Sequence, residues 1–89
     1  MDSNSVSHNL AEGRFEIAVE GRRALLQYRR SDDSMRLIHT EVPEPLRGRG
    51  LGKLLVRAAL DYAHFNKLKI VPICPFVKLY LEKHPEAAG

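Results

Sequence analysis

The first half of the chain alternates between apolar and polar residues, as half-buried strands do. One such stretch covers residues 14–20 and a second covers residues 24–28 after Gly21, so we expect the two to form a hairpin. A third stretch, residues 35–42, is more apolar, which is typical of a central strand. It should end at Pro43, because proline lacks the amide hydrogen that a strand ladder needs.

The third stretch mixes apolar and polar side chains, and the two-residue period of a strand predicts how they are divided between its faces. On this basis His39 and Glu41, which can both exchange protons, share a face just before a glycine-rich segment. One face should carry Met35, Leu37, His39 and Glu41, and the other Arg36, Ile38, Thr40 and Val42.

The second half of the chain has a helical period. Apolar residues recur every three or four positions over residues 51–62, with charged residues between them. Residues 69–73 are typical of a short buried strand, and residues 75–83 of a second helix with Pro75 in its first turn. The order β-β-β-α-β-α predicts an α+β fold with an α/β-like part: antiparallel N-terminal strands in a mixed sheet, then a parallel crossover around the main helix.

A chain of 89 residues has room for one domain, which we place at residues 14–86, after a flexible leader (1–13) and before a short tail (87–89). One cysteine cannot form an internal disulfide, and with four scattered histidines it makes no zinc-ligand pattern, so we expect no metal. No apolar stretch reaches the roughly 20 residues that span a bilayer, and the polar start lacks a signal-peptide core. We therefore expect a soluble, cytoplasmic protein without membrane contact, as a monomer or weak dimer.

The glycine-rich segment connects the third expected strand to the main expected helix. Gly48, Gly50 and Gly52 allow backbone conformations with positive φ and leave amide N–H groups accessible. The N-terminus of a helix attracts anions through those amides and its dipole, and Arg47 and Arg49 add positive charge. The segment is thus a candidate phosphate site.

Two better-known glycine motifs do not fit this segment. A nucleoside-triphosphatase loop, G-x-x-x-x-G-K-[ST], matches Gly52 and Lys53 but requires glycine at Arg47 and a hydroxyl side chain at Leu54. A dinucleotide fingerprint, G-x-G-x-x-G, needs a different glycine spacing and a preceding βαβ start. The segment is therefore neither a nucleoside-triphosphatase loop nor a dinucleotide-binding motif.

The segment instead resembles the R/Q-x-x-G-x-G/A signature of the GNAT superfamily of N-acetyltransferases, as Arg47-x-x-Gly50-x-Gly52 followed by an amphipathic helix. Its flanks, His39-Thr40-Glu41-Val42-Pro43 and Cys74-Pro75-Phe76, resemble a subfamily of minimal GNAT-like proteins. The likeness covers residues 14–86 and implies a GNAT-type sheet. It departs from larger members in lacking the two helices between the first strands that cover the acceptor.

The resemblance implies that acetyl-coenzyme A (acetyl-CoA) is the donor substrate. Its pantetheine arm would pair with the backbone from Thr40 to Val42, where the strand splays from its parallel neighbour. Its pyrophosphate would lie on the amides of the loop and first helical turn. The residues of that cradle would be Arg47, Gly48, Arg49, Gly50, Leu51, Gly52 and Lys53.

Four side chains are candidates for catalysis. His39 and Glu41 lie where either could take a proton from an acceptor amine, although a lone strand histidine is often a packed, hydrogen-bonded residue. Cys74 precedes a helix N-terminus, which favours a thiolate, and could act as nucleophile or as acid to the leaving thiolate; the alternative is an inert buried cysteine. Tyr80 matches a stretch in which larger GNAT enzymes keep a tyrosine general acid, or it only packs.

The resemblance favours an N-acetyltransferase that transfers acetyl from acetyl-CoA to an unidentified amine on a small molecule or protein. Because the acceptor-covering helices are missing, a non-catalytic coenzyme A or acyl-CoA binding module is an alternative. A small basic nucleic-acid or protein-interaction domain is a third, suggested by arginine pairs such as Arg22-Arg23 and Arg29-Arg30. Nucleic-acid binding is disfavoured, because the strands lack an exposed aromatic platform.

Overall fold

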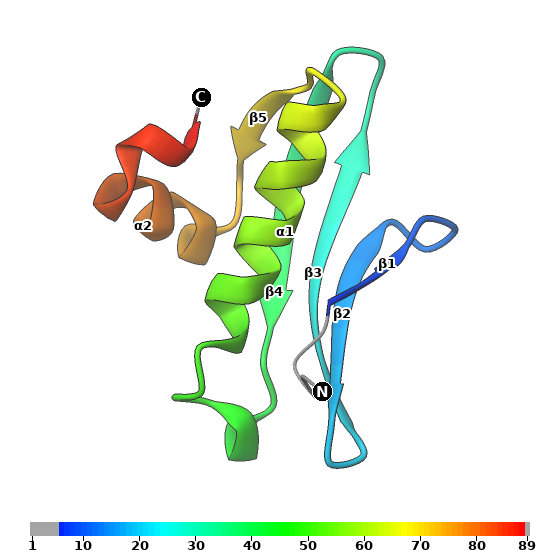
Figure 1. Ribbon diagram of the computed structural model, residues 1–89, viewed down its shortest axis with the longest axis vertical. Coiled ribbons are helices and arrows are strands. Elements are labelled where there is room, and N and C mark those ends of the chain that lie inside the picture. Colours follow the sequence, from blue (N-terminus) through cyan, green and yellow to red (C-terminus); the bar gives the residue numbers. More distant parts are fainter. Residues whose placement is uncertain (1–5, 89) are drawn as a thin grey trace.

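The computed structural model describes residues 6–88, which form one mixed sheet with helices packed against it (Figure 1). The strands are β1 (Ser7–Asn9), β2 (Arg14–Val19), β3 (Arg22–Arg30), β4 (Ser34–Glu41) and β5 (Lys69–Pro72). The helices are α1 (Leu51–Phe65) and α2 (Pro75–Lys83), with 3₁₀ turns η1 (Glu44–Leu46) and η2 (Pro85–Ala88).

The sheet has the order β1-β2-β3-β4-β5, so every strand lies beside its neighbour in sequence. The pairings from β1 to β4 are antiparallel, and β5 pairs with β4 in parallel. Parallel neighbours need a long crossover, and α1 supplies it. The predicted mixed sheet with a parallel crossover around the main helix is confirmed.

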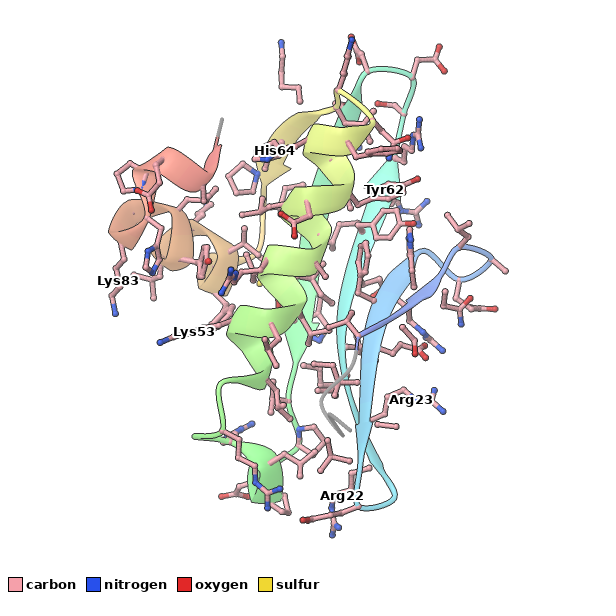
Figure 2. The ribbon with its side chains drawn as sticks, viewed as in Figure 1. Arg22, Arg23, Lys53, Tyr62, His64 and Lys83 are labelled. Atoms are coloured by element: carbon pink, nitrogen blue, oxygen red, sulfur yellow. The ribbon has the colours of Figure 1, made fainter. Side chains whose placement is uncertain are left out.

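The leader expected over residues 1–13 is wrong for its middle part, because Ser7–Asn9 form the edge strand β1. The reason lies in side-chain packing. The His8 ring stacks on Phe15 at 4.1 Å and meets the Tyr62 ring edge-on at 4.6 Å, and His8 Nε2 lies 2.6 Å from the Tyr28 hydroxyl. Figure 2 shows Tyr62 reaching from α1 toward the strands. Residues 1–5 of the expected leader lie outside the described residues.

The core lies between α1 and one face of the sheet. Buried side chains alternate along β2 and β3, as the sequence predicted, and meet the apolar stripe of α1. In Figure 1 α1 lies in front of β4, and α2 lies beside α1 near β5. Among residues 6–88 no helix covers the other side of the sheet, which we call the open face. It carries Arg14, Glu16, Ala18, Arg23, Leu25, Gln27, Arg29, Arg36, His39, Glu41, Lys69 and Val71.

A bulge in β4 changes which face its last residues occupy. Tyr28 of β3 pairs with Leu37, but the next pair along is Gln27 with His39, so Ile38 has no partner in the ladder. From there the alternation is shifted, and Thr40 lies opposite the fully buried Leu26 on the helix side.

The face predicted for the end of this strand is therefore wrong. His39 and Glu41 do share a face, but it is the open face and not the face of Met35 and Leu37. Thr40 takes the helix side in their place. The extra residue at the bulge is the physical reason for the difference.

The part of the chain that the structure describes has neither a membrane-spanning helix nor a cluster of metal ligands. None of its helices has the length and hydropathy needed to cross a membrane. No three His, Cys, Asp or Glu side chains in residues 6–88 gather closely enough to hold a metal ion.

Candidate functional site

The glycine loop ends in a helix N-terminus that carries no side-chain cap. Gly48 and Gly50 have φ of 86° and 77°, in the left-handed region that glycine adopts at little cost. Gly50 is the N-cap residue of α1, and its carbonyl accepts the first helical hydrogen bond from the Leu54 amide at 3.2 Å. The amides of residues 51–53 precede that bond, and they point out of the helix toward any anion bound there.

A cavity of about 630 Å³ opens in front of these amides. This volume is within the usual range of about 300–1,000 Å³ for small-molecule sites. Its walls come from the end of β4, from the loop with the first turn of α1, and from the start of α2. They are formed by residues 39–42, 46–48 and 50–53 and by Phe76.

The strands on either side of this cavity separate where β4 passes its last pairing with β5. The parallel ladder ends at Leu37 and Pro72, while β4 continues to Glu41. The amides of Ile73 and Cys74 both donate to the Leu37 carbonyl, at 3.0 and 2.9 Å, and the chain then turns into α2. Among residues 6–88 the end of β4 therefore has no strand partner on its β5 side, so an extended ligand can pair with its backbone there.

Two of the three predicted cationic side chains of the cradle line the cavity. Arg47 Nε donates to the Val42 carbonyl at 3.1 Å, which holds this arginine beside the loop. Lys53 projects from the first turn of α1 and is exposed (Figure 2). Arg49 is directed elsewhere: its guanidinium pairs with Glu20 at 3.2 and 3.4 Å, and it does not line the cavity. The structure thus separates Arg49 from the rest of the predicted cradle.

Gly52 allows the two helices to approach closely at the cavity. A Cβ atom at this position would lie 2.7 Å from Cζ of the Phe76 ring, closer than atoms can pack. The ring closes one wall of the cavity. Phe76 was not among the predicted site residues, although its place in the Cys74-Pro75-Phe76 motif could have indicated it.

The bulge brings Thr40, which lines the cavity, against Cys74, which lies behind it and does not line the cavity itself. Their Oγ1 and Sγ atoms are 3.4 Å apart, and Cys74 is only 5% exposed. Burial raises the pKa of the Cys74 thiol, but hydrogen bonds with the Thr40 side chain and with the backbone of Val77 and Phe76 outweigh it and hold the pKa below its usual value. These hydrogen bonds therefore give the buried Cys74 a larger thiolate fraction than an ordinary cysteine has.

His39 and Glu41 lie on the opposite side of the same strand end. Their Nε2 and Oε1 atoms are 3.9 Å apart, both side chains are more than half exposed, and both line the cavity. Thr40, between them in sequence, points to Cys74 instead. The end of β4 thus directs His39 and Glu41, which can accept protons, toward solvent, and Thr40 toward the buried Cys74 thiol.

Tyr80 is not brought to this site. Its ring packs on His84 with centroids 4.6 Å apart, and it borders a shallow groove beside the outer face of α1. None of the residues that line the main cavity belongs to that groove. Of the four predicted catalytic side chains, the structure groups His39, Glu41 and Cys74 around the end of β4 and leaves Tyr80 apart.

Comparison with known proteins agrees with the resemblance found in the motifs. A family model described as GCN5-related N-acetyl-transferase matches residues 14–89. Protein NATD1 of Xenopus tropicalis is 34% identical over 96% of this chain and 84% of its own length, and human Protein NATD1 is 36% identical over 90% and 74%. The solution structure of a GCN5-like protein from Staphylococcus aureus, 33% identical, superposes with a TM-score of 0.75 over 98% of this chain and 86% of that one. The chain belongs to the GCN5-related N-acetyltransferase family.

Proposed function

We propose that this protein is an acetyl-CoA-dependent N-acetyltransferase. The observation that carries the proposal is the continuous cavity from the uncapped N-terminus of α1 to the unpaired end of β4, beside which Cys74 is buried. A donor with a pyrophosphate at one end and a thioester at the other matches these two ends in chemistry. Membership of the family adds support.

The residues present fit the donor at each point. The amides of residues 51–53 and the side chains of Arg47 and Lys53 would bind the pyrophosphate, since helix N-termini and cations both attract phosphate. The backbone of residues 40–42 would pair with the pantetheine amides. Arg49 is left out of this cradle, because Glu20 engages it.

Transfer to an amine needs a neutral nitrogen and a proton for the departing thiolate. The nitrogen attacks the thioester carbonyl carbon, the carbon–sulfur bond breaks, and His39 or Glu41 accepts the proton of the amine. Cys74 then has two possible roles. As a thiol it donates its proton to the departing thiolate; as a thiolate it first takes the acetyl group itself and passes it to the amine.

A non-catalytic coenzyme A binding module is the second candidate. It is favoured by the open face, because no helix among residues 6–88 encloses an acceptor beside His39 and Glu41. Such a module would bind the donor as tightly as the enzyme does and release no coenzyme A thiol.

Intact-mass analysis after incubation with acetyl-CoA tests these alternatives, using wild type and Cys74→Ala, with and without an amine. An acetyl adduct on wild type that Cys74→Ala lacks selects the covalent route. No adduct, with coenzyme A thiol released in excess of protein once an amine is added, selects direct transfer.

Saturable binding with neither adduct nor release selects the binding module and contradicts the enzyme. The chain has one cysteine, so a thiol reagent reads a protein background of at most one equivalent. Gly50→Val, which should bind the donor roughly 100-fold more weakly, corrects for uncatalysed acetylation of surface lysines.

A further inference from the structure

The open face is strongly cationic away from the cavity. Arg23 and Arg29 on β3, Arg36 on β4 and Lys69 on β5 are all exposed and come from three adjacent strands. This face is turned away from the viewer in Figure 1, behind α1. No helix in the described part of the chain shields these charges.

Two of these arginines repel each other and so lower the stability of the folded state. Arg29 and Arg36 are directly opposite each other in the β3–β4 register, and like charges in that position destabilise a sheet. Within residues 6–88 no carboxylate lies within ion-pair distance of either one. Glu16, by contrast, engages Arg14 and Arg23. Because the charges of Arg29 and Arg36 are not neutralised within the described residues, an anionic partner that binds both would remove their repulsion.

The surroundings of the pair favour a polypeptide over a nucleic acid. Partly buried Leu25 and Val71 lie among the cations and offer apolar contact to side chains. Among the described residues the exposed phenylalanine rings, Phe65 and Phe76, lie on the helices, and His39 is the one exposed ring on this face, so the face lacks a platform for successive stacked bases. The exposed carboxylate of Glu41 would also repel a continuous phosphate backbone that crosses this face.

The same face carries the groups proposed to receive the acceptor's proton. His39 and Glu41 lie on it, and His39 follows Arg36 along β4 at roughly 10 Å, from about 3.3 Å per residue of strand. An extended peptide beside β4 covers the same distance in about three of its own residues.

We propose that the open face docks an acidic polypeptide segment and that this segment is the acceptor. Its amine meets His39 and Glu41, and acidic residues about three positions away neutralise Arg29 and Arg36. The inference rests on the proposed transferase function for the amine, whereas the docking of the acidic residues rests only on the charges of the face.

The probe is a labelled peptide with a single lysine and glutamates three and four positions from it, compared with the same peptide carrying glutamines. Fluorescence anisotropy measures its binding and mass analysis its acetylation. We expect the glutamate peptide to bind about tenfold more tightly, because it forms two additional ion pairs and each exposed ion pair contributes only modestly to affinity. Arg29→Ala/Arg36→Ala should abolish the difference.

The matched control, Arg57→Ala/Lys83→Ala, removes two exposed charges from the helix side, where Figure 2 shows Lys83 on α2. It should keep the preference for the glutamate peptide. Because Arg29→Ala/Arg36→Ala relieves a repulsion, its melting temperature should equal or exceed that of wild type, so lost binding cannot be ascribed to unfolding.

The outcomes separate this inference from the proposed function. Equal binding of both peptides, alongside normal coenzyme A binding and transfer, overturns the docking inference and leaves the enzyme standing. Arginine-dependent binding of the glutamate peptide without its acetylation, while another amine still releases coenzyme A thiol, supports the docking surface, overturns its role in presenting the acceptor and leaves the enzyme standing. Tighter arginine-dependent binding of a single-stranded oligonucleotide than of the glutamate peptide overturns the choice of a polypeptide.

Discussion

Gly50 and Gly21 provide a matched pair of substitutions for testing the cradle. Both have φ in the left-handed region, 77° and 75°, and at both a Cβ atom would meet no other atom within 4 Å. Gly50 caps α1 at the cavity, whereas Gly21 lies in the β2–β3 turn. Replacing either by valine therefore imposes the same backbone strain at different places.

The size of each effect follows from that strain. A non-glycine residue in this region costs about 1–2 kcal/mol, so each variant should melt roughly 4–16 °C below wild type. Only in Gly50→Val does relief of the strain reorient the amides of residues 51–53. Loss of two amide–phosphate hydrogen bonds at about 1.5 kcal/mol each lowers coenzyme A affinity by roughly 100-fold.

Titration calorimetry with coenzyme A, alongside thermal melts of both variants, measures the two effects. Gly21→Val should melt early and bind normally, and Gly50→Val should melt early and bind poorly. Unchanged affinity in Gly50→Val, or an equal loss in Gly21→Val, would refute the placement of the pyrophosphate.

Two further predictions concern the arginines of the loop and His8. Arg47→Ala should weaken coenzyme A binding about fivefold to tenfold, whereas Arg49→Ala should change it less than about twofold, because Arg47 lines the cavity and Arg49 pairs with Glu20; equal losses in a binding titration would argue against this assignment. Burial lowers the pKa of His8 below its usual 6.5, so the unfolded chain binds the proton more readily, and stability should be lost as the pH falls below about 6.5 and on through the folded-state pKa. Urea melts at pH 7.5 and 5 should show this loss in wild type and in His64→Gln but a smaller one in His8→Phe, and an undiminished loss in His8→Phe would show that other groups cause it.

Features set by local periodicity could be predicted from the sequence. The β2–β3 hairpin, α1 and α2 follow from apolar spacing and from turn residues such as Gly21, and the structure has them within a few residues of the expected positions. The glycine loop was predicted to be a phosphate site from its glycines and arginines and from the strand and helix that flank it. Its left-handed glycines and uncapped helix start agree with that interpretation.

Features set by distant contacts could not be predicted. The bulge at Ile38 depends on how β4 pairs with β3, and no property of residues 35–42 alone indicates it. It moved Thr40 to the side of Cys74 and His39 to the open face. Arg49 likewise left the cradle because Glu20, far away in sequence, lies within reach of its guanidinium.

The edge strand β1 was missed for a related reason. Its three residues are too few to show an alternating pattern, and what holds them is the ring packing of His8 with Phe15 and Tyr62. Tyr80 shows the same limit at the other end of the chain. Its motif matched, but the direction of α2 turns its ring to His84 and away from the cavity.

The most direct test of the proposed donor site is an amide NMR titration of ¹⁵N-labelled protein with acetyl-CoA. The account predicts saturating shifts of the amides of residues 51–53 and 40–42, with those of Gly21 and its turn unchanged. Saturable binding that leaves residues 51–53 unshifted, or no binding at millimolar acetyl-CoA, would contradict it.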